Sequence, residues 1–141
     1  MKLARRGDTR VEHIDVPSFQ EAVSEYLIRH RSILDCISKF DEATARVNRA
    51  IIKAVTSCGC VRISASRQTY PPDASLTDLK KYTVSHLDGT LCPECRDVVE
   101  TELGRALFYI AALCDLLDLD MEDIMEVERG RLSALGIFSL T

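Results

Sequence analysis

The sequence lacks tryptophan, and aromatic residues make up only 6% of its 141 residues. Proteins that bind single-stranded nucleic acid stack bases on aromatic side chains, and this chain has a formal net charge of -4, so we expect no nucleic-acid partner. No apolar run approaches the roughly 18–20 residues of a membrane-spanning helix. The basic N-terminus has none of the apolar stretch typical of a signal peptide. These absences predict a cytoplasmic protein with no membrane partner.

The composition is otherwise that of a soluble globular protein. Hydrophobic residues are 46% and charged residues 28% of the chain, which excludes a disordered or collagen-like sequence. We expect a basic, flexible tail over residues 1–16 and a single helical domain over residues 17–141. Within that domain, residues 57–95 form a cysteine-bearing insert, and we expect the cysteines to hold a metal site.

Apolar residues recur at helical spacing through most of the chain, which predicts an all-α bundle of four to five helices with one irregular, metal-fastened insert. Ser18 and Glu21 are spaced as a capping box that opens the first helix. The other helices are expected over about 30–56, from Ser75–Asp78 to about Leu87, from Cys92-Pro93 to about Leu117, and from a cap at Asp120 to a stop at Gly136. A short extended segment is expected over 61–66.

Two helices have clear apolar stripes. The helix over 30–56 is expected to bury Ile33, Ile37, Phe40, Thr44, Val47, Ile51 and Ala54. The helix after Cys92 is expected to bury Val99, Leu103, Ala106, Ile110, Leu113 and Leu117. Cys36 and Cys114 lie on or beside these stripes, and we expect them to be small buried core residues.

The other four cysteines form two close pairs that flank the insert. Cys58 and Cys60 are separated by one residue, and Cys92 and Cys95 by two. Tetrahedral Zn²⁺ takes four thiolates, and closely spaced pairs supply two each with little strain. The backbone amides at the start of the helix after Pro93 favour the thiolate form of Cys92. The spacing therefore predicts a structural metal site, with zinc as the expected ion.

Three alternatives remain for these cysteines. Cys92 and Cys95 at a helix start could act as a redox dithiol, although no strand precedes them and a second pair is present. An iron–sulfur cluster uses the same ligand set, which spacing does not exclude. The four thiols could also carry no metal.

Three segments resemble MazG-like nucleotide pyrophosphohydrolases. Residues 102–110 are similar to the third helix of that family, and residues 116–124 to the link into its last helix. The stretch similar to the second helix runs from Lys39-Phe40-Asp41-Glu42 to Asn48-Arg49-Ala50-Ile51. The resemblance covers about half of the chain. It implies an all-α bundle that forms dimers or tetramers and a Mg²⁺-dependent cleavage of nucleoside triphosphates.

The chain departs from that family where its metal ligands stand. The family holds Mg²⁺ with acids one turn apart on two facing helices, and the resemblance places Ala43, Arg46, Glu102 and Arg105 at those positions. Only Glu102 is an acid. We expect Glu42 to pair with Arg46 and Glu102 with Arg105, and the arginines to occupy the metal positions and bridge carboxylates across the old site. The alternative is a charged stripe that faces water.

These departures lead to three functional hypotheses. The first is a MazG-like, zinc-binding protein with a degenerate Mg²⁺ site and a scaffold or partner-binding role. The second is an active hydrolase that uses Mg²⁺ with a relocated acid set, Glu42, Glu100 and Glu102. The third is a thiol-based redox or metal sensor. Arg46, Arg49 and Lys53 share a helix face and could hold a phosphate, so a nucleotide is a possible ligand in the first two hypotheses.

A homo-oligomer is also expected. The family resemblance implies a dimer or tetramer. Independently, the helix after Cys92 carries apolar residues beyond its main stripe, which often meet another subunit: Leu107, Phe108, Tyr109 and Leu116. The alternative is that neighbouring helices of the same chain cover these residues.

Overall fold

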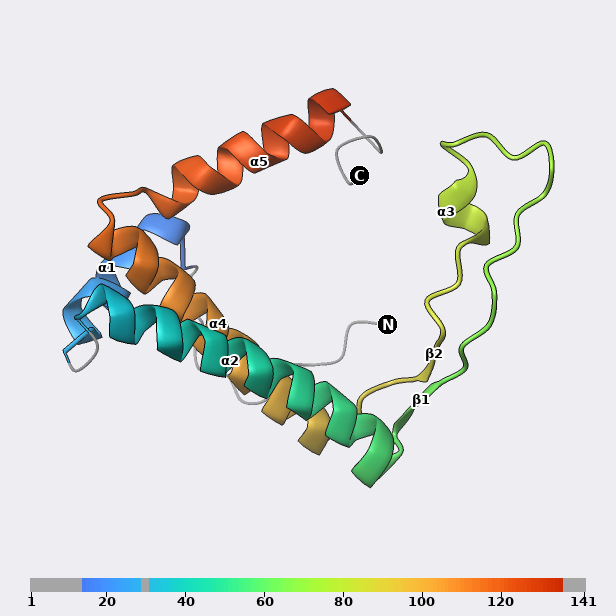
Figure 1. Cartoon of the computed structure of the whole chain (residues 1–141), viewed down its shortest axis with the longest axis horizontal. Coiled ribbons are helices and arrows are strands. Elements are labelled where there is room, and N and C mark those ends of the chain that lie inside the picture. The colour runs from blue at the N-terminus through green and yellow to red at the C-terminus, as the bar shows by residue number, and fades with distance from the viewer. Residues whose placement is uncertain (1–13, 29–30, 136–141) are drawn as a thin grey trace.

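The chain is mainly helical, as expected, with one small sheet (Figure 1). The computed structural model describes residues 14–28 and 31–135. Their elements are α1 (Val16–Tyr26), α2 (Ile33–Lys53), a π-helical turn η1 (Ala54–Cys58), β1 (Val61–Ile63), α3 (Leu79–Tyr82), β2 (Leu87–Gly89), α4 (Pro93–Leu116) and α5 (Met121–Leu135). Most of the expected tail and the expected stop at Gly136 lie outside the described residues. No described helix is long and apolar enough to cross a membrane.

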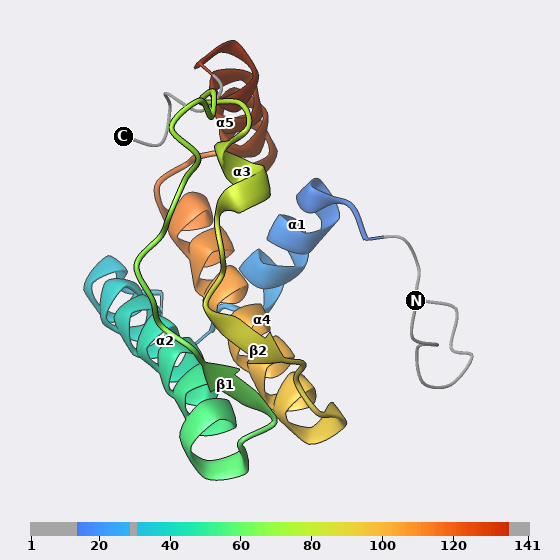
Figure 2. The same cartoon turned by 90° about the vertical axis from the view of Figure 1, so that its right-hand side faces the viewer.

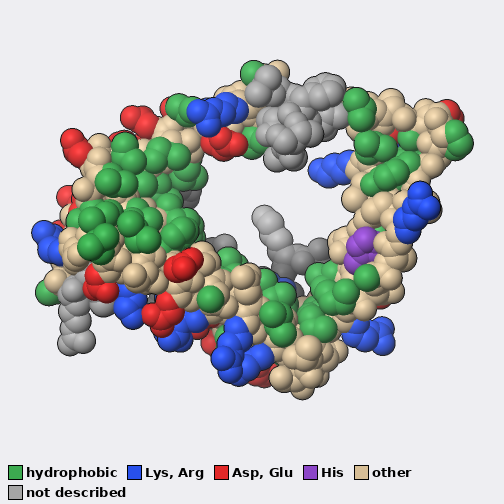
Figure 3. Space-filling model, viewed as in Figure 1, with side chains coloured by type: hydrophobic (Ala, Val, Ile, Leu, Met, Phe, Trp, Pro, Cys, Tyr) green, Lys and Arg blue, Asp and Glu red, His purple; other side chains and the backbone are tan. Residues whose placement is uncertain are grey.

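Helices α2 and α4 form a long antiparallel hairpin that carries the other elements (Figures 1 and 2). Helix α1 packs against α4 at one end of the hairpin, and α5 leaves from that same end. The insert, residues 57–95, leaves from the opposite end and contains β1, α3 and β2. The space-filling view shows an open hollow between the insert and α5 (Figure 3).

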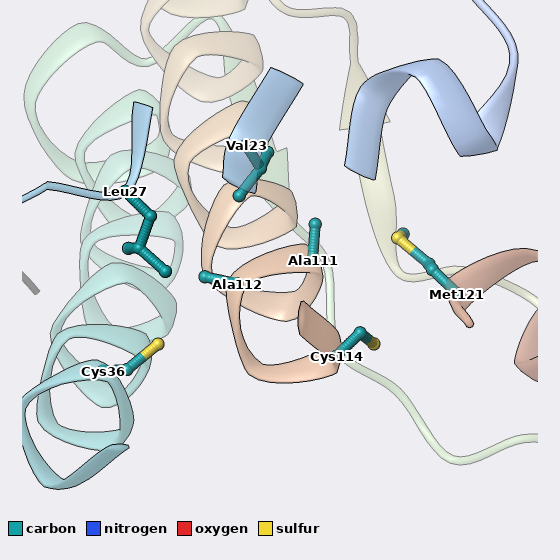
Figure 4. Packing of buried hydrophobic residues seen from close by; sticks show 7 residues of the cluster. All are labelled: Val23, Leu27, Cys36, Ala111, Ala112, Cys114 and Met121. Atoms are coloured by element: carbon teal, nitrogen blue, oxygen red, sulfur yellow. The ribbon is translucent and has the colours of Figure 1, made fainter. Parts of the chain in front are cut away.

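The hydrophobic core lies at the α1 end of the hairpin (Figure 4). Val23 of α1 and Leu27, the residue just after α1, extend over the α4 backbone at Ala111 and Ala112, two alanines that have no exposed surface. Their small side chains let the helices approach closely. The core cluster also contains Cys36, Cys114 and Met121, which confirms the prediction that Cys36 and Cys114 are core residues.

The buried line of α2 differs from the expected stripe. The residues of α2 and η1 that are buried are Cys36, Ala43, Ala50 and Ala54, whereas Ile37 is 52% and Ile51 43% exposed. The expected stripe is confirmed at Ala54, and its members Ile33, Phe40, Thr44 and Val47 are partly buried, but it was wrong at Ile37 and Ile51. The most buried line is rotated towards Cys36, Ala43 and Ala50, because small residues rather than the isoleucines allow α4 to come close. In α4 the expected stripe is confirmed at the buried Val99, and Ala106, Ile110 and Leu113 are partly buried. It was wrong at Leu103, which is 46% exposed, and at Leu117, just after the end of α4, which is 56% exposed.

Local signals explain where the helices begin. The Asp15 carboxylate accepts a hydrogen bond from the Ser18 backbone N–H at 2.8 Å, so Asp15 caps α1 and the expected cap at Ser18 was wrong. Asp120 caps α5 as expected, because its carboxylate accepts from the backbone N–H groups of Glu122 at 2.8 Å and Asp123 at 3.1 Å. Pro93 occupies the first turn of α4, where its missing N–H is not needed.

The insert is less helical than expected. Helix α3 ends at Tyr82, and Leu87 belongs to β2, so the expected helix to Leu87 was wrong. The Gln68 side chain explains this end: its Nε2 donates to the Val84 carbonyl at 2.6 Å, and its Oε1 accepts from the Val84 N–H at 3.0 Å. This clamp satisfies both backbone groups of Val84 outside a helix. Strand β2 pairs antiparallel with β1, with Val61 opposite Gly89.

Candidate metal centre

The four cysteines of the insert come together where α2 and α4 meet the small sheet. Cys58 ends the π-helical turn η1, and Gly59 follows in the left-handed region with φ +75°, where glycine is unstrained. This reversal sets Cys60 just before β1. Because α4 runs antiparallel to α2, its first residues return to the same place. The four sulfur atoms all lie within 4.8 Å of one another.

Cys92 occupies the N-cap position of α4, as the sequence predicts. Its sulfur accepts a hydrogen bond from the Cys95 backbone N–H at 3.5 Å, a contact that lowers the pKa of the Cys92 thiol. Desolvation and hydrogen bonding to Cys58 and Glu94 outweigh this contact, so that without a metal ion the pKa of Cys92 lies above its usual value, contrary to the expected preference for the thiolate. The Sγ atoms of Cys58 and Cys92 are 3.8 Å apart. In a tetrahedral zinc site with Zn–S bonds of about 2.3 Å, the sulfur atoms are separated by about 3.8 Å. The residues present therefore fit a four-thiolate metal ion.

Gly89 of β2 supports this centre, and its importance was not predicted from the sequence. Its φ is +87°, and a Cβ atom built there would lie 2.6 Å from the backbone oxygen of Cys60. Only glycine lets β2 pass this close to a cysteine of the cluster. The sequence signal was present in Asp88-Gly89, which predicts a turn but not the neighbour that the glycine contacts.

The thiol pKa values are driven apart by the crowding of sulfur atoms. A backbone hydrogen bond from Cys92 holds the pKa of the Cys60 thiol below its usual value. Hydrogen bonding to Cys92, with desolvation and the neighbouring sulfurs, raises the pKa of Cys95 to about 12. Such a group gives up its protons in coupled steps. A bound dication offsets the repulsion between the thiolates, which is the chemistry that a structural metal supplies.

A second group of functional candidates lies between α2 and α4, nearer the middle of the two helices than the cysteines are. A cavity of about 310 Å³ is lined by Lys39, Glu42, Ala43, Arg46, Arg105 and Tyr109. The expected pairs form: Arg46 contacts Glu42 at 2.8 Å, and Arg105 contacts Glu102 at 3.0 Å. Each pair lies within one helix, the Glu42–Arg46 pair in α2 and the Glu102–Arg105 pair in α4. The expected bridges across the two helices are absent from the residues that the structure describes, because each carboxylate already has a cation on its own helix.

The proposed acid set is not gathered into one site. Glu42 bonds to Lys39 and Arg46, whereas the exposed Glu100 pairs with Arg96 at 3.8 Å. Across residues 14–28 and 31–135, the four cysteines are the one group of metal-ligating side chains with the spacing for a shared ion. Arg49 is exposed on α2 and does not line the cavity. Sequence reasoning missed Lys39 and Tyr109, which complete the lining.

Glu102 is the least exposed of these acids. Its side chain is 14% exposed, and its Oε2 is buried without a hydrogen-bond partner among the described residues. The residue sits on the side of α4 that faces α2, where most positions are apolar. Arg105 neutralises the carboxylate at its other oxygen. A buried acceptor that lacks a partner is costly, so the position of Glu102 is poorly explained by stability alone.

The Glu42 carboxylate provides a pH-dependent test of this charged group. Hydrogen bonds from Lys39, then Arg46, lower the pKa of Glu42 from 4.5 to about 2. A depressed folded-state pKa means that its stabilising contribution is present above pH 4.5 and is lost as the pH falls towards 2. We expect Lys39→Met to raise the pKa of Glu42, measured by carboxyl NMR titration, and Lys53→Met to leave it unchanged. An identical titration in both variants would contradict the contact.

Fold and site together define a mainly helical protein with a four-thiol centre at the base of an insert. No family model matches this chain, and neither a curated protein nor a solved structure does.

Proposed function

We propose that Cys58, Cys60, Cys92 and Cys95 bind one zinc ion that fastens the insert to the end of the α2–α4 hairpin. The observation that carries this proposal is the mutual approach of four sulfur atoms within 4.8 Å. A zinc ion with four protein ligands has no open position for substrate, so its role is structural rather than catalytic. The ion would connect Cys58 and Cys60, which precede β1, to Cys92 and Cys95, which follow β2, and would thereby hold the two ends of the insert together.

We further propose that the chain is a divergent MazG-like protein in which the helical hairpin acts as a scaffold or partner-binding surface. The resemblance of residues 39–51 and 102–124 supports this relationship. The cationic groups of Arg46 and Arg105 line the cavity between α2 and α4, and they disfavour a second cation there. The proposal therefore includes a degenerate Mg²⁺ site. It also keeps the cytoplasmic location and the homo-oligomer that the sequence predicts.

The hydrolase and sensor hypotheses make different predictions. An active hydrolase requires Glu42, Glu100 and Glu102 to act together with Mg²⁺, and the unpartnered Oε2 of Glu102 is the observation in its favour. A redox sensor requires two thiols to form a disulfide, and the 3.8 Å separation of the Cys58 and Cys92 sulfurs favours that hypothesis. Oxidation would then expel the metal, because a disulfide is a poor ligand.

A single preparation tests these proposals. We expect about one zinc per chain by elemental analysis, and no pyrophosphate release from a nucleoside triphosphate panel with Mg²⁺ or Mn²⁺. Zinc-free protein would overturn the zinc proposal. If the protein instead contains iron and shows the visible absorption of a cluster, the centre is an iron–sulfur centre and not a zinc site. Pyrophosphate release that Glu102→Gln abolishes would establish the hydrolase instead of the scaffold.

A further inference from the structure

The cavity between α2 and α4 is walled mainly by cationic side chains. Lys39 and Arg46 of α2 and Arg105 of α4 line it, and Glu42 is the acid among the described residues of its lining. A positive excess remains when the neighbouring Glu102 is counted as well, although the whole chain carries a formal net charge of -4. The side chains of the three cations are between 35% and 55% exposed, so a ligand from solvent can reach them.

The Glu42 carboxylate does not use all the hydrogen-bond donors of these cations. Its Oε2 accepts from the Lys39 ammonium at 2.8 Å, and its Oε1 accepts from Nε and Nη2 of Arg46 at 3.1 and 2.8 Å. Both oxygens of this acid are therefore engaged, whereas a lysine has three N–H donors and an arginine five. Among the described residues, Nη1 of Arg46 bonds to no acceptor. Donors thus remain in the cavity for a further acceptor.

Arg105 brings a second guanidinium group to the cavity from the facing helix. Its Nη1 donates to Oε1 of Glu102 at 3.0 Å, and its Nε and Nη2 bond to no acceptor within residues 14–28 and 31–135. Hydrogen bonding to Glu42 raises the pKa of Arg46, and charge attraction from Glu102 across the helix contact adds to that rise. The second oxygen of Glu102 is buried, so it is not exposed at the cavity surface. A buried carboxylate therefore lies beside guanidinium groups of both helices.

The uncharged residues of the lining limit the size of the cavity. Tyr109 forms part of the wall, and its ring meets that of Phe108 edge to face, with the centroids 5.2 Å apart. Ala43, which is 3% exposed, contributes only a methyl group. The cavity volume of about 310 Å³ lies at the lower end of the roughly 300–1,000 Å³ typical of small-molecule sites. The cavity therefore suits a small ligand rather than a peptide helix.

We propose that this cavity binds a phosphate group directly, without a metal ion, through Lys39, Arg46 and Arg105. A phosphate group carries at least three strong acceptor oxygens on one centre, which complements the remaining N–H donors of both helices. Guanidinium groups also match phosphate oxygens in planar, bidentate pairs. A carboxylate offers only two oxygens. The proposal rests on the degenerate Mg²⁺ site of the proposed function, because the cations replace the ion, and it is independent of the zinc centre.

Calorimetric titration of the full chain with inorganic phosphate tests this site. The buffer contains no Mg²⁺ and is held at constant ionic strength with sodium chloride, which screens unspecific attraction of anions. We expect one site per chain with a Kd below about 1 mM, unchanged by added Mg²⁺. Arg46→Met should weaken binding by at least about 10-fold, because bonds from charged donors are lost. Arg49→Met removes the same charge from an exposed position outside the cavity, so it should change the Kd by less than about 2-fold.

Circular dichroism checks that each variant folds, and Arg105→Met replaces Arg46→Met if the latter does not. No phosphate binding up to about 10 mM overturns the proposal, as does binding that requires Mg²⁺ or that the Arg46 and Arg49 variants weaken equally.

A parallel titration with glycerol 3-phosphate identifies the source of the phosphate group. Tighter binding than that of inorganic phosphate supports a small phosphate ester as the ligand, and equal or weaker binding supports free phosphate. Pyrophosphate release with Mg²⁺ would overturn the degenerate site of the proposed function. Absence of both pyrophosphate release and phosphate binding would overturn this proposal alone, so the two can fail separately.

Discussion

Replacing Cys92 with serine is expected to remove the metal ion and release the insert while leaving the helical hairpin folded. Cys92 is the N-cap of α4, and its sulfur lies 3.8 Å from that of Cys58. A serine hydroxyl still caps a helix, but it is a far weaker zinc ligand than a thiolate. Loss of a hydrogen-bond partner of a metal ligand already costs about 10- to 100-fold in affinity, so we expect loss of the ligand to exceed 100-fold.

The consequences should be confined to one end of the molecule. The core around Leu27, Cys36 and Ala112 lies at the other end of the hairpin from the cysteine cluster (Figures 1 and 4). Hydrogen exchange is therefore expected to accelerate at amides of β1 and β2 in Cys92→Ser, whereas amides in the middle of α2 and α4 stay protected. Far-ultraviolet circular dichroism should change little. Unfolding of the whole chain would contradict this division.

Cys36→Ser is the matched control for this substitution. Cys36 has no exposed surface and belongs to the core cluster, so a hydroxyl placed there should lower the free energy of unfolding by about 1–3 kcal/mol. Zinc stoichiometry should stay at the wild-type value. The two serine variants are thus expected to show opposite defects. Retention of zinc at wild-type affinity by Cys92→Ser would overturn the ligand assignment.

The sequence was most informative about chemistry that depends on spacing. Two cysteine pairs at the ends of predicted helices required little more than an antiparallel hairpin to meet, and the structure brings all four sulfurs together. The positions of α4 and of the Asp120 cap were predictable for a similar reason, because capping acts within one turn of the chain. Local signals of this kind do not depend on tertiary packing.

The buried face of α2 could not be predicted in the same way. The helix carries isoleucines beside a line of alanines and a cysteine, and periodicity favours the larger apolar residues. Close approach by α4 instead selects Ala43 and Ala50, which leaves Ile37 and Ile51 partly exposed. Which line faces the partner depends on the distance between helix axes. That distance is a property of both helices and is not encoded in either one alone.

Strand β2 and the short α3 depend on contacts distant in sequence. Leu87–Gly89 has no strand pattern of its own, and it is ordered by pairing with Val61–Ile63. The end of α3 reflects the Gln68 side chain, which bonds to Val84 from 16 residues away. The stretch Ser75–Asp78 predicts a helix start, and α3 does begin at Leu79. The helix stops after four residues because the clamp holds the chain beyond it.

Gly89→Ala is expected to damage the metal centre without altering any ligand. The added methyl group would lie 2.6 Å from the Cys60 backbone oxygen, and alanine at φ +87° is itself strained. The left-handed conformation alone costs about 1–2 kcal/mol, and the contact with rigid backbone adds to it. We expect zinc affinity to fall by at least about 10-fold, since each tenfold change corresponds to about 1.4 kcal/mol. Competition with a zinc-binding dye measures this change.

Two other glycines separate the causes of that loss. Gly59 also has a positive φ, +75°, but nothing lies within 4 Å of an added Cβ, so Gly59→Ala should show the backbone strain without the collision. Gly104, inside α4, has open space around it, and Gly104→Ala should stabilise the helix by about 0.5–1 kcal/mol with unchanged zinc affinity. A Gly89→Ala variant no weaker in zinc binding than Gly59→Ala would mean that the approach of β2 to Cys60 does not support the centre. A larger loss would show that the sheet at the base of the insert and the four thiols form one structural unit.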